Sequence, residues 1–331
     1  MAETATKMKL RMSFESNPRV EPIMAGRVPI PGIEIEWERM EPGAAFLHHL
    51  THNDFDAFEF SISHYIGTRA RANPAYEGWI MVPIFTSKPT FMFYSLYLRP
   101  ASGVSSLADL KGKRIGVPDF TMTGAVWFRI VLRVLYGIQP QDIRWVNTRP
   151  ANRRQGRTMG VDHDTGSGVH IANIDESTTP QQMVERGELD AVLGGSGGPV
   201  AAASGIKQFT PQDWLPVLVE LQKKIGVTPV NHCVLVQKRL LEERPSLARD
   251  LFDAFERSKQ EAYTRDPKAR AILAELDLAR QRELFGEDPY PYGLRANRRV
   301  LELIADQNVI DGVIRERPAI DSLVVQGLRS T

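Results

Sequence analysis

Hydrophobic and polar positions alternate in several short stretches of the chain, and helix-like stretches separate them. Strand-like alternation occurs at 9–14, 32–40 and 55–61, and apolar runs occur at 78–85 and 91–100. Between these stretches, 43–53 has the spacing of a helix. Because strands and helices follow one another in this way, we expect an α/β protein with mostly parallel sheets.

The pattern starts afresh after residue 100. A short helix and a new strand are expected within 106–119, then a helix at 123–136 and a strand at 142–147. Residues 148–169 are rich in Gly, Arg and Asp and have no period, which indicates a loop. The stretch 178–195 predicts a helix, a glycine stop and a buried strand.

The last third of the chain combines two apolar stretches with long helices. The stretches 214–219 and 230–237 predict strands that return to the first domain. Amphipathic spacing predicts helices at 246–263, 268–285 and 295–306.

These patterns predict two lobes, each a mostly parallel sheet flanked by helices. Lobe 1 is expected to be discontinuous, with residues 1–98 and 206–331, and lobe 2 to be an insert of residues 99–205. Ligands of open α/β sheets bind beyond the carboxyl ends of the strands. We therefore expect a ligand cleft between the lobes, with the two chain crossings as a hinge.

Composition narrows the partners that this chain could bind. Its 331 residues hold 41 Lys and Arg against 40 Asp and Glu, a net charge of +1. A net charge this close to zero gives no electrostatic argument for binding to nucleic acid or to an anionic membrane surface. There is one cysteine, no run of about 18 apolar residues and no secretory signal at the start of the sequence. We expect a cytoplasmic protein unless a signal was removed, and a homo-oligomer is compatible with the sequence.

Four segments carry a resemblance to a known family. They read DLKGKRIGVPDFTMTGAVWFRIVL, MVERGELDAVL, PVNHCVLVQKRL and YGLRANRRVLELI. Together they resemble the 4,5-dihydroxyphthalate decarboxylase family, which is related to the type II periplasmic solute-binding proteins. The likeness covers most of residues 8–315. It differs at 147–168, which matches the family's proline-glycine-arginine phrase only loosely, and at 192–199, where glycines replace an expected arginine.

The resemblance implies a fold and a reaction. The fold is that of a two-lobed, type II periplasmic-binding-like protein. The activity is that of a carbon–carbon lyase: cofactor-independent decarboxylation of a hydroxylated, phthalate-like aromatic acid by ring protonation and loss of carbon dioxide. A non-catalytic solute-binding protein for a small organic acid is the alternative, since two lobes can close on a ligand without chemistry. A heterocycle synthase of similar fold is less favoured, because its His- and Cys-rich signature is missing.

The turn before the helix at 123–136 is a candidate anion site. Thr121, Thr123 and Gly124 stand where the first backbone N–H groups of the helix have no partner, and such a helix start accepts a carboxylate. The alternative is that one threonine only caps the helix. Arg129 follows two turns later and would either bind substrate or form a salt bridge.

His232 is the candidate proton donor. Histidine exchanges protons near neutral pH, and decarboxylation of an electron-rich ring needs a proton at the carbon that loses its carboxylate. A structural histidine at a hinge is the alternative; the family resemblance favours the catalytic role. Neighbouring side chains of a strand face opposite ways, so Cys233 is expected to be a buried hydrophobic residue, and Asn231 is assigned to substrate binding.

Other polar residues near predicted strand ends complete the candidate site. Glu59, Ser61 and Ser63 should share one side of a strand, with Glu59 accepting a phenolic proton from the substrate. Arg19, in the loop after the first strand, could pair with a carboxylate. Ser196, in a Gly-rich turn between a strand and a helix, could donate a hydrogen bond to the substrate. The turn lacks the lysine of a P-loop, so we expect no nucleotide. No metal is expected.

Overall fold

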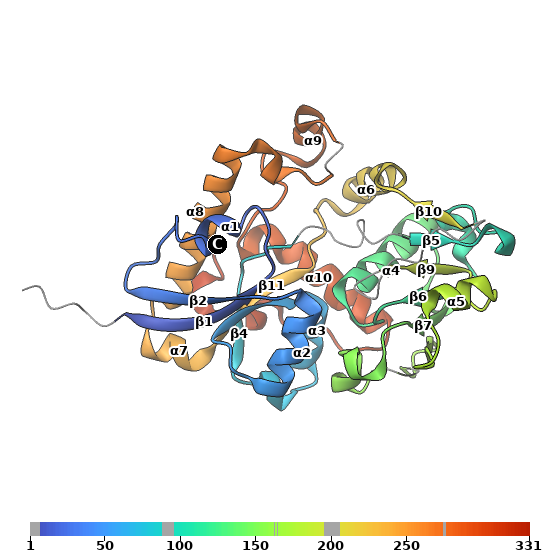
Figure 1. Ribbon diagram of the computed structural model, residues 1–331, viewed down its shortest axis with the longest axis horizontal. Coiled ribbons are helices and arrows are strands. Elements are labelled where there is room, and N and C mark those ends of the chain that lie inside the picture. Colours follow the sequence, from blue (N-terminus) through green and yellow to red (C-terminus); the bar gives the residue numbers. More distant parts are fainter. Residues whose placement is uncertain (1–6, 88–95, 162, 164, 195–205, 274–275) are drawn as a thin grey trace, which may run out of the picture.

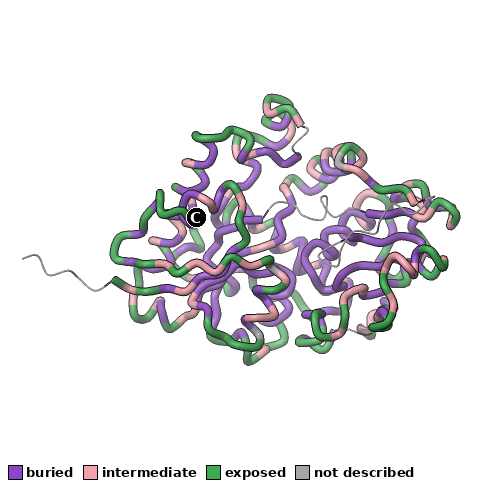
Figure 2. Tube along the Cα trace, viewed as in Figure 1, coloured by how far each residue is buried: buried purple, intermediate pink, exposed green. Residues whose placement is uncertain are grey.

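Two β-sheets, each flanked by helices, form the two halves of the molecule (Figure 1). The computed structural model describes residues 7–87, 96–161, 163, 165–194, 206–273 and 276–331. The buried positions lie mainly on the strands and on the inner sides of the helices in both halves (Figure 2). The α/β class predicted from the sequence is confirmed.

The first sheet has five strands. Their order is β2 (Ile33–Arg39), β1 (Met8–Phe14), β3 (Ala57–Ser61), β11 (His232–Gln237) and β4 (Trp79–Val82). Strand β1 is parallel to both neighbours, whereas β11 is antiparallel to β3 and β4. Every residue of β3 and β4 is buried, as expected for strands that are covered on both faces.

The second sheet has six strands. Its order is β10 (Lys207–Phe209), β5 (Leu96–Leu98), β9 (Ala191–Leu193), β6 (Arg114–Val117), β7 (Arg144–Asn147) and β8 (His170–Asn173). The four strands β9, β6, β7 and β8 are parallel to one another, and β5 is antiparallel to both β9 and β10.

The lobe boundaries differ from the expected ones. Boundaries at 98/99 and 205/206 would place β5 and β10 with the first sheet, but both strands are hydrogen-bonded within the second. Short strands of three residues depend on the neighbours that complete their hydrogen bonds, and these neighbours could not be read from the chain. The chain thus crosses between β4 and β5 and again between β10 and β11.

Ten α-helices are found in the described part of the chain. They are α1 (Glu21–Met24), α2 (Pro42–His52), α3 (Ile62–Ala70), α4 (Thr123–Tyr136), α5 (Pro180–Glu185), α6 (Pro211–Ile225), α7 (Lys238–Glu243), α8 (Leu247–Arg265), α9 (Leu278–Phe285) and α10 (Leu294–Ile310). Helix α10 packs against both α3 and α4 and so joins the two halves at the centre of the molecule (Figure 1).

One strand prediction is wrong. The apolar stretch 214–219 lies inside helix α6. A capping box explains the helix: the Thr210 hydroxyl and N–H donate to the Asp213 carboxylate at 2.8 and 2.7 Å, and a proline follows Thr210 at the first helical position. A short apolar run fits a strand and a buried helix equally well, and the cap decides for the helix.

Candidate functional site

His232 and Glu59 are in direct contact. His232 is the first residue of β11, opposite Ser61 on β3, and Glu59 lies two residues before Ser61, on the same side of the sheet. The Nδ1 atom of His232 is 2.8 Å from Glu59 Oε1. The side chain of His232 is 13% exposed and that of Glu59 only 3%, so the histidine is the member of the pair that a ligand can reach.

The Glu59 carboxylate is held in its ionised form. Burial alone would raise its pKa, but hydrogen bonds from His232, from the Thr86 hydroxyl and from the Glu15 N–H bring the pKa below its ordinary value. An ionised carboxylate only accepts hydrogen bonds, so Nδ1 of His232 must carry a hydrogen. Its Nε2 makes no hydrogen bond to any residue that the structure describes, and is therefore the nitrogen left for a ligand.

Thr86 and Ser87 connect the predicted site residues. The Thr86 hydroxyl donates to Glu59 at 2.8 Å, and its carbonyl oxygen accepts a hydrogen bond from the Arg19 guanidinium. The Ser87 hydroxyl accepts the N–H groups of Asn231 and His232 at 3.0 and 2.9 Å. This dipeptide was not identified from the sequence. The signal that could have found it is a pair of polar residues directly after an apolar stretch.

Arg19 is a buried positive charge. Its exposed fraction is 0%, and its guanidinium lies 3.9 Å from the centre of the Tyr290 ring. Besides Thr86, it donates to the Ala269 carbonyl at 3.4 Å. Among the described residues no carboxylate lies within ion-pair distance of it. A buried charge without a counter-ion is costly, and a bound anion would offset that cost.

Helix α4 begins against the end of β3. The Thr123 hydroxyl pairs with the Ser61 hydroxyl at 2.8 Å and accepts the Ser63 N–H at 3.0 Å, and Gly124 follows, buried, in the first turn. The expected row on one strand is wrong at Ser63, because β3 ends at Ser61 and the next residues form the first turn of α3. The Ser63 hydroxyl donates instead to Asn308 on α10, at 3.0 Å.

A second histidine, His64, contacts the turn that precedes α4. The Nε2 atom of His64 is 2.7 Å from the Thr121 hydroxyl, which donates to Asp119 at 2.7 Å. The other Asp119 oxygen accepts the N–H groups of Gln155 and Gly156. Burial lowers the pKa of His64 to about 4, so the ring is neutral and donates to Thr121. The threonine hydroxyls expected to hold a ligand thus also join the two halves of the protein.

The neutral state of His64 predicts an acid-sensitive fold. Between pH 6.5 and 4 the unfolded chain binds a proton that the folded protein does not, so the free energy of unfolding falls as pH falls. Replacing His64→Gln should flatten this slope by up to about 1.4 kcal/mol per pH unit near pH 5. Urea unfolding from pH 4 to 7 measures it. His49, buried with a pKa also near 4, should keep part of the slope, and an unchanged slope would contradict the assignment to His64.

Arg129 does not belong to this cluster. Its guanidinium donates to Asp311 at 2.9 and 2.7 Å and lies 3.7 Å from the centre of the Phe120 ring. Both partners of the ion pair are buried, at 1% and 0% exposure. The salt bridge named as an alternative from the sequence is present, and the contact of Arg129 with substrate stays a prediction.

Asn231 and Ser196 are the two remaining candidate residues. Asn231 is 2% exposed, and its side-chain oxygen is buried without a hydrogen-bond partner in the described residues. Ser196 lies outside the residues that the structure describes.

Within the described residues no group of three or more His, Cys, Asp or Glu side chains is arranged to hold a metal ion. None of their helices has the length and apolar character to cross a membrane.

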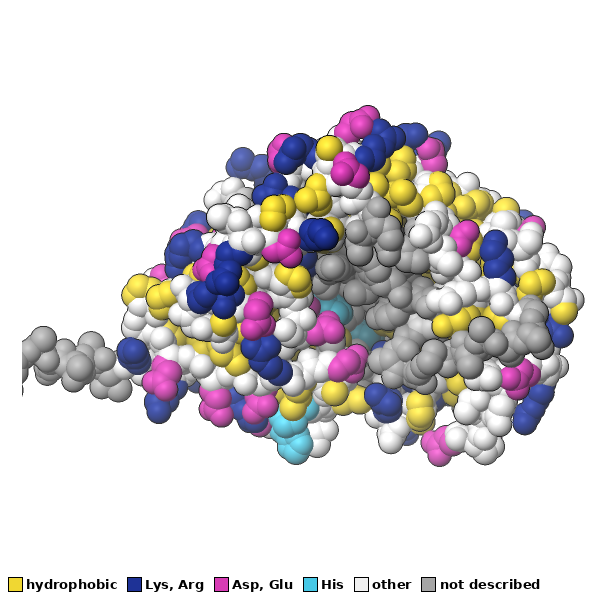
Figure 3. Space-filling view, turned by 45° about the horizontal axis from the view of Figure 1, so that its top comes forward, with side chains coloured by type: hydrophobic (Ala, Val, Ile, Leu, Met, Phe, Trp, Pro, Cys, Tyr) yellow, Lys and Arg dark blue, Asp and Glu magenta, His cyan; other side chains and the backbone are white. Residues whose placement is uncertain are grey.

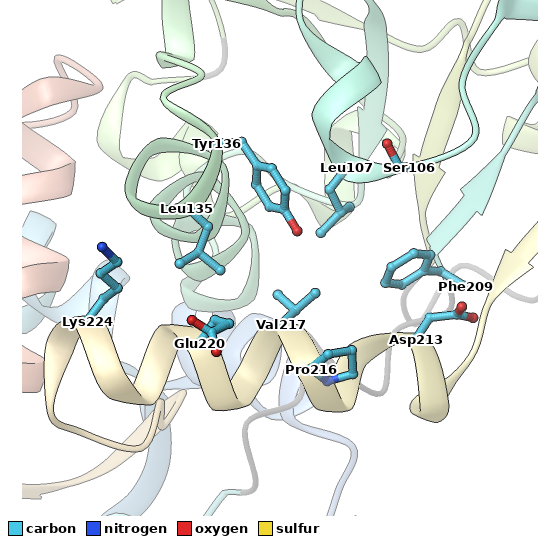
Figure 4. A pocket seen from close by; sticks show the side chains of 10 residues that line it. All are labelled: Ser106, Leu107, Leu135, Tyr136, Phe209, Asp213, Pro216, Val217, Glu220 and Lys224. Carbon is cyan, nitrogen blue, oxygen red and sulfur yellow. The ribbon is translucent and has the colours of Figure 1, made fainter.

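The surface is hollowed between the two halves, and histidine and acidic side chains lie in the hollow (Figure 3). A separate cavity of about 440 Å³ lies between α4, α6 and residues 106–107 (Figure 4). Its walls are mainly apolar, with Leu107, Leu135 and Val217 pointing inward, and none of the candidate site residues lines it. Because its side chains include histidine and acidic residues, the hollow is a better candidate for the functional site than this apolar cavity.

Comparison with known proteins places the chain in a family. No family model matches it. A 4,5-dihydroxyphthalate decarboxylase from Comamonas testosteroni is 31% identical over 320 residues, which cover 94% of both chains. A second, from Pseudomonas putida, is 35% identical over 189 residues, 57% of this chain and 70% of that protein.

Solved structures of low sequence identity show the fold. The periplasmic aliphatic sulphonate binding protein SsuA from Escherichia coli superposes with a TM-score of 0.54 at 15% identity, over 96% of this chain and 92% of that one. A conserved Candida albicans gene product with the generic periplasmic binding protein fold gives 0.51 at 13% identity, over 96% of each chain. The predicted fold and resemblance are confirmed: the chain has a periplasmic-binding-protein fold and belongs to the 4,5-dihydroxyphthalate decarboxylase family.

Proposed function

We propose that this protein decarboxylates a hydroxylated, phthalate-like aromatic acid, with His232 as the proton donor. The observation that carries the proposal is the 2.8 Å contact between Nδ1 of the partly exposed His232 and the buried Glu59 carboxylate, which leaves Nε2 available to a ligand. Relatives named as 4,5-dihydroxyphthalate decarboxylases supply the substrate class.

The reaction needs one proton and releases one carbon dioxide. His232 in its doubly protonated form transfers the Nε2 proton to the ring carbon that carries the leaving carboxylate, and a C–H bond forms. The C–C bond to the carboxylate then breaks, and its electron pair returns to the ring. Carbon dioxide leaves, aromaticity is restored, and His232 takes a new proton from solvent.

Glu59 acts as a positioning residue in this scheme. The sequence suggested that it accepts a phenolic proton, but its carboxylate is buried and already accepts from His232, Thr86 and Glu15. A carboxylate at Nδ1 fixes the ring orientation and directs Nε2 towards the substrate, as in other carboxylate–histidine pairs. Arg19 supplies the positive charge for a substrate carboxylate.

Replacing Glu59→Gln tests this role. We expect kcat to fall about 100-fold with little change in KM, because the variant loses orientation of the proton donor rather than substrate contact. Glu34→Gln, at an exposed position of β2, is the control and should leave both constants unchanged. A rise in KM as large as the loss of kcat would contradict the positioning role and assign Glu59 to substrate contact.

The second candidate is a solute-binding protein. It is favoured by the fold shared with the periplasmic aliphatic sulphonate binding protein SsuA, because two lobes can close on a ligand without chemistry. Incubation of the purified chain with a panel of hydroxylated phthalates and benzoates separates the two functions. Release of carbon dioxide from a member of the panel supports the decarboxylase. Tight binding without gas from any member would support the solute-binding function instead.

A further inference from the structure

Tyr292 holds a buried hydroxyl group that has no hydrogen-bond partner in the described part of the chain. The residue is 7% exposed, and its hydroxyl makes no hydrogen bond to the residues that the structure describes. Its ring lies 4.2 Å from Lys259 Nζ, which fixes the side chain from one side. Buried hydroxyls are nearly always hydrogen-bonded, and one left without a partner costs about 1–3 kcal/mol. Among the described residues this hydroxyl is therefore a donor that a ligand could use.

The backbone places Tyr292 beside the site. The N–H of the next residue, Gly293, donates to the Pro83 carbonyl at 2.8 Å, in the segment that leads to Thr86 and Ser87. Two residues earlier, the Tyr290 ring covers the Arg19 guanidinium. The segment that carries Tyr292 is thus tied both to the Thr86–Ser87 connection and to the buried cation.

Arg19 offers a second donor without a partner. Two of its three nitrogens donate to the carbonyl oxygens of Thr86 and Ala269, whereas its buried Nε has no partner in the described residues. The Tyr292 phenol is buried, as Arg19 is, and lies two residues after the tyrosine whose ring centre is 3.9 Å from the Arg19 guanidinium. Burial raises the pKa of that phenol, so Tyr292 keeps its proton and can donate it in a hydrogen bond.

We propose that the Tyr292 hydroxyl and Arg19 Nε bind one substrate carboxylate, the one that is retained when its neighbour leaves as carbon dioxide. The inference rests on the proposed function. It gives a physical reason why the site should prefer an aromatic dicarboxylate to a monocarboxylate. One oxygen of the retained carboxylate accepts from Arg19 and the other from Tyr292. Its negative charge offsets the buried guanidinium.

Replacing Tyr292→Phe tests the assignment, because it removes the hydroxyl and keeps the ring over Lys259. We expect the Kd for phthalate, measured by calorimetry, to rise about tenfold or more, while the Kd for benzoate changes less than twofold. With 4,5-dihydroxyphthalate as substrate, KM should rise by a similar factor. Stability should be unchanged or higher, since the variant loses a hydroxyl that has no partner among the described residues.

Tyr263→Phe is the matched control. The Tyr263 hydroxyl donates to Asp288 at 2.9 Å, so its removal should lower the unfolding midpoint and leave the phthalate-to-benzoate ratio intact. Phthalate binding that is equal in Tyr292→Phe and wild type, or a loss that is equal for phthalate and benzoate, would overturn the proposal, as would a wild type with no preference for phthalate. If no carbon dioxide is released but the preference for phthalate depends on Tyr292, the proposed function fails and this binding site stands.

Discussion

Replacing His232→Asn should lower kcat for decarboxylation by about 10²–10⁴-fold while substrate binding changes little. The imidazole is the group that carries a proton to the substrate, and general acid catalysis contributes rate enhancements of this order. Asparagine retains a side chain of similar shape at the start of β11 and can still donate to Glu59. Steady-state kinetics and calorimetric binding of the substrate to the variant separate the two effects.

His52→Asn is the control for this experiment. His52 is exposed at the end of α2, and its replacement should leave both kcat and Kd unchanged. Should the His232→Asn variant retain full decarboxylation, His232 would have no part in proton transfer. A parallel loss of binding would instead assign His232 to substrate recognition.

Replacing Asp311→Asn should lower the free energy of unfolding by about 3–5 kcal/mol. The substitution leaves the Arg129 guanidinium buried at 1% exposure without its carboxylate, and an unpaired buried charge is among the costliest defects in a protein. The ion pair joins α4 to the end of α10, so its loss also loosens the helix that begins at Thr123. Urea unfolding of variant and wild type measures the difference.

Two further variants show whether charge is the cause. Asp253→Asn breaks an ion pair with Arg249 that is half exposed on α8, and should cost less than about 1 kcal/mol. Arg129→Met combined with Asp311→Leu should recover most of the loss, because it removes both charges from the interior. If Asp311→Asn costs no more than Asp253→Asn, the buried pair does not stabilise the contact between α4 and α10.

The sequence predicted most elements of the fold because their patterns are local. The alternation at 9–14 and 32–40 and the buried run at 55–61 correspond to β1, β2 and β3. The strand expected at 214–219 failed because a capping box outside the apolar run decides between strand and helix. The same limit hid the end of β3 at Ser61, where the chain turns from strand to helix within one residue.

The candidate site was predictable in its members but not in its contacts. Arg19 follows β1 and Glu59 lies near the end of β3, so the carboxyl-end rule brings both to the same edge of the sheet. His232 begins β11 and reaches that edge because β11 is antiparallel to β3. The pairing of His232 with Glu59 depends on the antiparallel register of strands 173 residues apart in the chain, which no local pattern encodes. For the same reason, the Asp311 partner of Arg129 could not be foreseen.

Decarboxylation in D₂O tests the central claim most directly. With purified protein and 4,5-dihydroxyphthalate, we expect one equivalent of carbon dioxide for each ring consumed. The same ring should carry one deuterium at the carbon that lost its carboxylate, as seen by NMR, and the His232→Asn variant should form neither product at a comparable rate. Tight binding of the same compound by the wild type, with no carbon dioxide and no deuterium in the ring, would contradict proton transfer from His232.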